Sequence, residues 1–266
     1  MQIFWGLILG TLIAFFAYRV GALDPGGAIA AVVVGGLIFG LGGLPWAALL
    51  LLFFLSSSLL SRAFERQKFG LTEKFAKGSR RDYGQVLANG GLGALLALIQ
   101  VAYPALDWLW IAYVGAMAAV TADTWATEVG VLSRSAPVLI TTGARVERGS
   151  SGGVTLVGCL ASLAGALAVG LAASLFSPTL PLGLVLLAAG VGGLAGAFFD
   201  SLLGATLQGI YYCPHCEKET ESHPLHRCGT QTTPFRGWRW LDNDRVNFLC
   251  SVVGAVGMLS VWILLG

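Results

Sequence analysis

Two aspartates lie inside apolar segments, where an ionised carboxylate is costly. Asp123 follows a run, residues 109–120, that contains no charged side chain, and Asp200 lies in the apolar stretch 181–208. Acids within membrane helices usually face the bundle interior or a water-filled cavity, and they usually serve function. We therefore expect Asp123 and Asp200 to belong to a functional site, with a structural hydrogen bond or a place in the headgroup zone as the alternative for each.

Each aspartate continues a stripe of small residues at four-residue spacing. Ala119 precedes Asp123, and Gly192 and Gly196 precede Asp200. Small faces let helices approach closely, so both acids should point into the bundle. Because Mg²⁺ prefers oxygen ligands and often takes one or two carboxylates together with substrate phosphates, the two aspartates predict a magnesium site.

Further polar residues extend this hypothesis. Glu128 comes five residues after Asp123, about 140° further round an ideal helix, so it joins Asp123 only if the helix unwinds or if it faces another helix. Asp244 is a third candidate magnesium ligand, with helix capping as an equal alternative. Gln208, near the stripe of Asp200, and Asn247, one turn after Asp244, are candidate substrate- or nucleotide-binding residues.

A glycine-rich segment, "ITTGARVERGSSGGVT", follows the first of these acids. Hydroxyls, guanidiniums and free backbone N–H groups before a helix would suit phosphate, and we expect that helix to begin near residue 151. The alternative is a flexible turn with arginines on anionic lipid headgroups. The candidate phosphate-binding residues are Thr141, Thr142, Arg145, Arg148, Gly152 and Gly153.

A second basic segment, "RRDYGQVLANGG", precedes another apolar stretch. Arg80 and Asn89 are candidates for positioning a phosphorylated substrate. The alternative is a capped helix start, with Gln85 and Asn89 bonding a neighbouring helix.

Cysteines and histidines cluster between the last two apolar segments. Cys213 and Cys216 are followed by Cys228, with His226 as the preferred fourth ligand and His223 as its competitor. This spacing is typical of a closed, structural zinc site. Disulfides are rare in the cytoplasm, where we place this loop, so the sequence predicts a zinc knuckle within an insertion at residues 210–244. The alternative is a polar loop with unligated thiols.

The composition excludes a soluble protein. Of 266 residues, 56% are hydrophobic and 11% are charged, and the mean hydropathy is +0.76. Soluble domains usually carry about 25% charged residues. We predict a single all-α membrane domain, residues 1–266, built as a polytopic helix bundle of about eight spans, with seven as the alternative. The expected spans are 2–18, 27–43, 45–62, 85–103, 107–129, 151–175, 181–208 and 246–265.

Basic residues mark one side of the membrane. All sixteen lysines and arginines fall in alternate connections or at their edges. The positive-inside rule puts these connections, and the candidate site, in the cytoplasm, with both termini outside. The first apolar segment has no basic residues before it, so we expect it to be retained as a span.

Several motifs together resemble a known family. "QVLANGG", "ADTWATEVG", "LITTGARVERGSSGGVT", "DSLLGATLQ" and "WLDNDRVN" occur in this order, and the chain resembles the transmembrane protein 19-like family, also called domain of unknown function 92, over nearly its whole length. The family's characterised plant branch implies phytyl-phosphate kinase activity, with CTP as the preferred donor. The motif positions are Asn89, Asp123, Glu128, Arg145, Gly152, Gly153, Asp200 and Asn247.

The resemblance and the residues together indicate a phosphotransferase at the cytoplasmic membrane face. Its expected partners are the bilayer, an isoprenoid monophosphate, Mg²⁺ and CTP or ATP, with no nucleic acid. A cytidylyltransferase or a phosphatase acting on the same lipids is one alternative. A transporter of an anion or a divalent cation is another. Prenyl chain length, the choice of nucleotide and the oligomeric state are left open.

Overall fold

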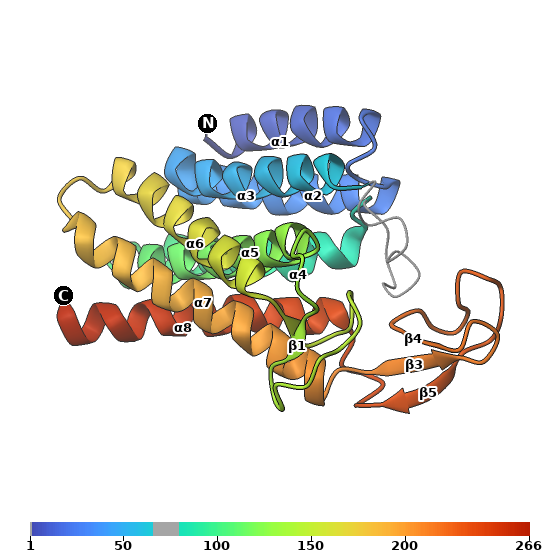
Figure 1. The fold of residues 1–266 in the computed structure, drawn as a ribbon. Helices are drawn as coiled ribbons and strands as arrows, with labels where there is room; N and C mark the ends of the chain where they lie inside the picture. The colour runs from blue at the N-terminus through green and yellow to red at the C-terminus, as the bar shows by residue number, and fades with distance from the viewer. Residues whose placement is uncertain (1, 66–79) are drawn as a thin grey trace.

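The computed structural model describes residues 2–65 and 80–266, and these residues form a bundle of eight α-helices with small sheets at one end (Figure 1). The predicted all-α membrane fold is confirmed. The helices are α1 (Gln2–Arg19), α2 (Pro25–Leu37), α3 (Gly43–Ala63), α4 (Tyr83–Ala102), α5 (Trp108–Gly130), α6 (Leu156–Phe176), α7 (Leu182–Thr206) and α8 (Asn243–Leu265).

A π-helical turn, Ile38–Gly42, connects α2 to α3. Gly43 follows with a positive φ of 81°, a conformation that suits glycine because it has no Cβ. The chain reverses here: α3 begins beside Gln2, and Arg62 at its other end donates a hydrogen bond to the carbonyl of Val20. Residues 25–63 are thus two antiparallel helices.

Six segments of the described chain are long and apolar enough to cross a membrane. Residues 25–63 count as one of the six, and α5 is not among them. The exact number of crossings, expected to be about eight, therefore stays a prediction.

Polar capping distinguishes the two ends of the bundle. The helices that start at the end carrying the small sheets have side-chain N-caps: Asp24 for α2, Asp82 for α4, Thr155 for α6 and Asp242 for α8. The helices that start at the opposite end, α3, α5 and α7, have none. Gln85 completes a capping box with Asp82, so the capped helix start considered for this segment is present.

Helix α5 forms the centre of the core and is buried from Ile111 to Ala122. Its small residues permit close packing, as the sequence predicts. A Cβ added to Gly115 would lie 2.5 Å from the carbonyl oxygen of Gly254 in α8, and one added to Gly196 in α7 would lie 2.5 Å from Cβ of Ala119. The stripes that carry the two aspartates therefore meet each other.

The polar connections form two small sheets. β1 (Val138–Leu139) pairs antiparallel with β2 (Gly153–Val154), and β3 (Ile210–Cys213) lies between β4 (Lys218–Thr220) and β5 (Thr233–Arg236). Both lie at the end of the bundle where α5 and α7 finish (Figure 1). The expectation that a helix begins near residue 151 is wrong: strand pairing holds residues 153–154, and α6 begins at Leu156 behind its Thr155 cap.

The described basic connections gather at that same end of the bundle. Their placement in the cytoplasm, and that of both termini outside, remains a prediction. Four basic residues that support it, Arg66, Lys68, Lys74 and Lys77, lie outside the described residues.

Candidate functional site

Asp123 of α5 and Asp200 of α7 come together at the loop end of the bundle. Each lies one turn beyond the contact between Ala119 and Gly196. Their carboxyl groups are close enough to interact electrostatically, and both act on the thiol of Cys250 in α8. Asp200 Oδ2 is buried and has no hydrogen-bond partner among the described residues. Close packing of α5 against α7 thus brings the carboxyl groups of Asp123 and Asp200 near each other.

A third carboxylate, Glu221, comes from the Cys/His loop, which we define as residues 210–244. Glu221 interacts electrostatically with Asp200. Its Oε1 accepts hydrogen bonds of 2.9 Å from Gln208 Nε2 and from Ser151 Oγ. The sequence did not single out Glu221, because a glutamate in a polar loop carries no signal of where it folds.

Gln208 and Gly152 join the loops to the end of α7. Gln208 is buried, and its side chain is held by Glu221. Gly152 has a positive φ of 84°, and a Cβ there would lie 2.5 Å from Cβ of Ala205. The glycine-rich segment therefore packs on α7 about one turn beyond Asp200.

Part of the phosphate-binding expectation requires correction. The backbone N–H of Gly153 donates to the carbonyl of Ser150, at 3.0 Å, so it is not a free donor before a helix. Arg148 donates hydrogen bonds to the carbonyls of Ser133 and Arg134 and so holds the loop together. Arg145, three residues before Arg148, is exposed, and its backbone forms an isolated antiparallel β-bridge with Val138.

Thr141 and Thr142 are exposed at the tip of this loop. Thr142 Oγ1 accepts a hydrogen bond from the backbone N–H of Ala144, at 3.3 Å, which stabilises the turn. Among the described residues, no hydrogen bond joins either threonine to the buried acids, so their role in phosphate binding stays a prediction.

Glu128 faces a different neighbour from Asp123. Helix α5 does not unwind before Gly130, and Ser61 Oγ of α3 donates a hydrogen bond of 2.8 Å to Glu128 Oε1. Burial lowers the pKa of the Arg81 guanidinium, and the charge of Glu128 opposes that shift. Glu128 and Arg81 are thus an electrostatic pair on the α3 and α4 side of α5.

Arg81 is half-buried, whereas Arg80 is exposed. Arg81 Nη1 donates a hydrogen bond of 2.7 Å to Ser58 Oγ, and the guanidinium lies over the rings of Phe53 and Phe54. The sequence pointed to Arg80, since two adjacent arginines give no signal of which one turns inward.

An apolar cavity of about 170 Å³ lies between α1, α2, α3 and α4. Its walls are aliphatic and aromatic, and its polar lining consists of Arg81, Gln85 and Asn89. Asn89 Nδ2 donates a hydrogen bond of 2.9 Å to the carbonyl of Gln85, one turn earlier on the same helix. The cavity therefore has a mostly apolar lining and one cationic side chain, that of Arg81.

Asp244 and Asn247 lie on the first turn and a half of α8 and are both half-buried. Capping of α8 falls to Asp242, whose Oδ1 accepts from the backbone N–H of Arg245 at 3.0 Å. Asp244 is thus not the cap, and its candidacy as a metal ligand stays a prediction.

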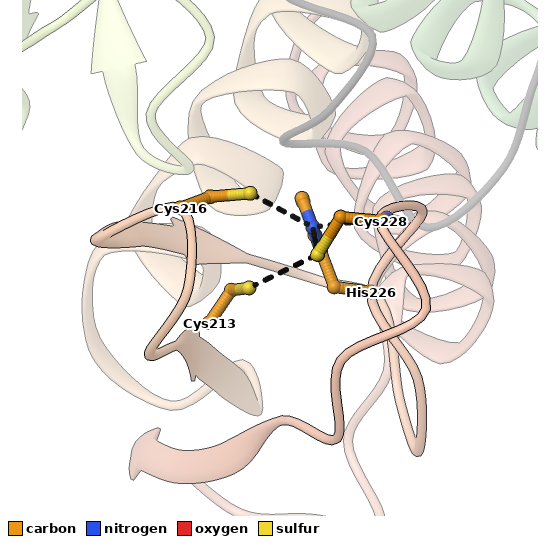
Figure 2. A group of neighbouring side chains, drawn as sticks. All are labelled: Cys213, Cys216, His226 and Cys228. Atoms are coloured by element: carbon orange, nitrogen blue, oxygen red, sulfur yellow. Dashed lines mark hydrogen bonds between the residues drawn. The ribbon is translucent and has the colours of Figure 1, made fainter.

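The four expected zinc ligands converge (Figure 2). One ligand atom from each of Cys213, Cys216, His226 and Cys228 lies within 4.8 Å of all the others. His223, the competing ligand, stacks on Tyr211 with ring centroids 4.3 Å apart. Hydrogen bonds with Thr230 and then His226 lower the pKa of Cys228 to about 5, and a hydrogen bond with Cys228 raises the pKa of Cys216 to about 12.

Comparisons with known proteins agree with the motif resemblance. The family described as integral membrane protein DUF92 matches residues 8–255. Protein PGR of Arabidopsis thaliana is 34% identical over 272 residues, which cover 93% of this chain and 92% of that protein. An uncharacterised membrane protein of Methanocaldococcus jannaschii is 33% identical over 211 residues, covering 78% of this chain and 84% of that protein.

An uncharacterised membrane protein of Synechocystis is 28% identical over 241 residues, covering 83% of this chain and 78% of that protein. No solved structure matches the chain. Because the family match extends over nearly the whole length and the Arabidopsis relative aligns along almost all of both proteins, this chain belongs to the integral membrane family DUF92.

Proposed function

We propose that this protein is an isoprenoid phosphate kinase. It transfers the γ-phosphoryl group of CTP, or of another nucleoside triphosphate, to an isoprenoid monophosphate such as phytyl or geranylgeranyl phosphate. An oxygen of the lipid phosphate forms the new bond to phosphorus, and the bond from that phosphorus to the β–γ bridging oxygen breaks. The nucleoside diphosphate leaves with the bridging oxygen, and the lipid becomes a diphosphate.

The observation that carries this proposal is the meeting of Asp123, Asp200 and Glu221 at one end of a membrane bundle. In phosphoryl transfer the protein takes little part in covalent chemistry. Catalysis depends on positioning the two substrates and on stabilising the negative charge of the transferred phosphoryl group. Acids from two packed helices and one loop supply a rigid cation site at the surface where a soluble nucleotide and a membrane lipid can meet.

The donor set fits Mg²⁺. Carboxylate oxygens are its preferred protein ligands, and Asp200 Oδ2 is a buried oxygen without a hydrogen-bond partner among the described residues. Asp123 and Asp200, with Glu221, would hold the ion, which would neutralise charge on the donor phosphates. Gln208 and Ser151 keep Glu221 in place for this role.

The arginines take two different roles in this proposal. Arg145, exposed at the rim, binds donor phosphates, while Arg148 fixes the loop that carries it. Arg81 offsets the negative charge of the acceptor lipid phosphate, so that this phosphate can approach the negatively charged γ-phosphate of the nucleotide. Its aromatic neighbours Phe53 and Phe54 orient the guanidinium.

The cavity between α1 and α4 receives the apolar tail of the lipid. Its lining is almost wholly apolar, and Arg81, Gln85 and Asn89 provide the polar groups for a phosphate. A single-chain lipid with an anionic head matches this combination, since the tail gains an apolar surface and the head gains a cation.

The test is incubation of the purified, full-length protein with Mg²⁺, labelled CTP or ATP and a panel of prenyl monophosphates. We expect a prenyl diphosphate together with CDP or ADP. Release of pyrophosphate would instead mean cytidylyl transfer, and release of inorganic phosphate from the lipid would mean a phosphatase. Either outcome contradicts the kinase, as does flux of an ion through liposomes without turnover of any lipid.

Variants address the site itself. Asp123→Asn and Asp200→Asn should each lose most of the activity, and Asp107→Asn, at the opposite end of α5 before its first turn, serves as the matched control. Near-native rates in both site variants would contradict the metal assignment.

A further inference from the structure

The Cys/His cluster has the dimensions of a tetrahedral zinc site. Zn–S bonds of about 2.3 Å and Zn–N bonds of about 2.0 Å give a tetrahedron with edges of roughly 3.5–3.8 Å. Cys213 Sγ and Cys228 Sγ are 3.6 Å apart, and Cys216 Sγ and His226 Nδ1 are also 3.6 Å apart. His226 Nδ1 and Cys228 Sγ are 3.1 Å apart. Small side-chain rotations would place all four atoms around one ion.

Two turns of the backbone deliver the ligands. Cys213 and Cys216 flank the turn between β3 and β4, where Glu217 adopts a positive φ of 53°. His226 and Cys228 lie in a second turn, in which the N–H of Gly229 donates to the carbonyl of His226 at 2.9 Å. The second turn is closed further by the N–H of His226, which donates to the carbonyl of Thr230 at 2.9 Å. Ligand positions are thus set by hydrogen-bonded backbone.

Alternative uses of these thiols fit less well. A disulfide requires sulfurs about 2.05 Å apart, and Cys213 Sγ and Cys228 Sγ, at 3.6 Å, are not bonded. A small sheet of this size has little apolar core of its own, and such units usually depend on a metal or on disulfides for stability.

We propose that Cys213, Cys216, His226 and Cys228 bind one structural Zn²⁺, which fixes the Cys/His loop and thereby holds Glu221 beside Asp200. Four protein ligands close the coordination shell, so the ion takes no part in chemistry. Glu221 lies between the two ligand turns in sequence, directly after β4. Fixing both turns also fixes β4 and the residue that follows it, so Glu221 stays within hydrogen-bonding distance of Gln208 and Ser151.

The experiment measures metal content in the full-length protein, purified in detergent without a metal-affinity column. We expect about one zinc per chain, as for other sites with four protein ligands. Cys216→Ser and Cys228→Ser should lose it, while Cys159→Ser, a free cysteine in α6, should retain it. Protein grown with cobalt should show thiolate-to-cobalt absorption that disappears in the same two variants.

Histidine variants test the choice of the fourth ligand. His226→Ala should lower zinc content, His226→Cys should restore it, and His223→Ala should leave it unchanged. A fall in zinc on His223→Ala with none on His226→Ala would overturn the assignment.

A second measurement does not depend on whether the variants fold. Removal of zinc from the wild-type protein by a strong chelator should expose three additional thiols to alkylation, identified by mass spectrometry as Cys213, Cys216 and Cys228. No zinc in the purified protein, iron in its place, or unchanged thiol reactivity after chelation would each overturn the proposal. None of these measurements depends on kinase activity.

Discussion

Gln208, just beyond the end of α7, donates a hydrogen bond of 2.9 Å from Nε2 to Oε1 of Glu221 in the Cys/His loop. This bond joins the loop to the helix that carries Asp200 eight residues earlier. Glu221 also acts electrostatically on Asp200. The loop is therefore part of the candidate site, and its removal would affect the site directly.

Glu221→Gln should reduce prenyl phosphate phosphorylation by about 10-fold or more, because loss even of a residue that only supports a metal ligand typically costs about 10- to 100-fold. The substitution keeps the size of the side chain and removes its charge, so the magnesium concentration needed for half-maximal rate should rise. Glu219→Gln is the matched control, because Glu219 is an exposed residue on β4. Equal magnesium dependence in both variants would contradict a role for Glu221 at the cation site.

Arg81→Gln should destabilise the protein by about 3–5 kcal/mol, because it removes a cation that interacts electrostatically with the buried Glu128. The double variant Arg81→Gln, Glu128→Gln should recover part of this loss, since the buried carboxylate that interacts with Arg81 is then neutral as well. Thermal unfolding in detergent measures both. Arg80→Gln, at the exposed neighbour, should change the midpoint little, and an equal effect of the two arginine variants would argue against the pair.

Gly196→Ala should push α5 and α7 apart. The new methyl group would lie 2.5 Å from Cβ of Ala119 and 2.8 Å from the carbonyl oxygen of Cys250, and neither can move independently of its helix. We expect a loss of about 1–3 kcal/mol from overpacking, together with a fall in activity, because Asp123 and Asp200 separate.

Gly183→Ala is the control for this change on the same helix, since a Cβ there meets no atom within 4 Å. Its unfolding temperature and rate should match those of the wild type. Similar behaviour of the two variants would show that close packing at Gly196 does not position the acids.

Gly35→Leu should weaken binding of the isoprenoid. Gly35 lines the apolar cavity, and a Cβ added there meets no atom within 4 Å, so the larger side chain should occupy the cavity without straining the backbone. We expect KM for the lipid to rise by about 10-fold or more, with KM for the nucleotide unchanged. Gly91→Leu is the control: it has equal space, lies on α4, and is not part of the cavity lining. An unchanged KM for the lipid in Gly35→Leu would place the tail elsewhere.

The sequence by itself determined the membrane class, the approximate positions of the helices and the small faces through which α5 and α7 pack. These properties are local: composition sets the solvent, and four-residue spacing decides which side chains share a helix face. The same spacing directed Asp123 and Asp200 into the bundle, and a separate signal, the metal-ligand spacing of cysteines and histidines, singled out the four Cys/His residues. The structure brings these residues together in two groups.

Only the tertiary structure decided which groups from separate segments complete the site. Glu221, Arg81 and Ser61 acquire their partners through contacts between segments distant in sequence, and no periodic pattern specifies such partners. It also showed Glu128 facing α3, and Gly153 bonded within a turn ahead of α6, because helix rotation and strand pairing depend on neighbours that a linear pattern does not contain.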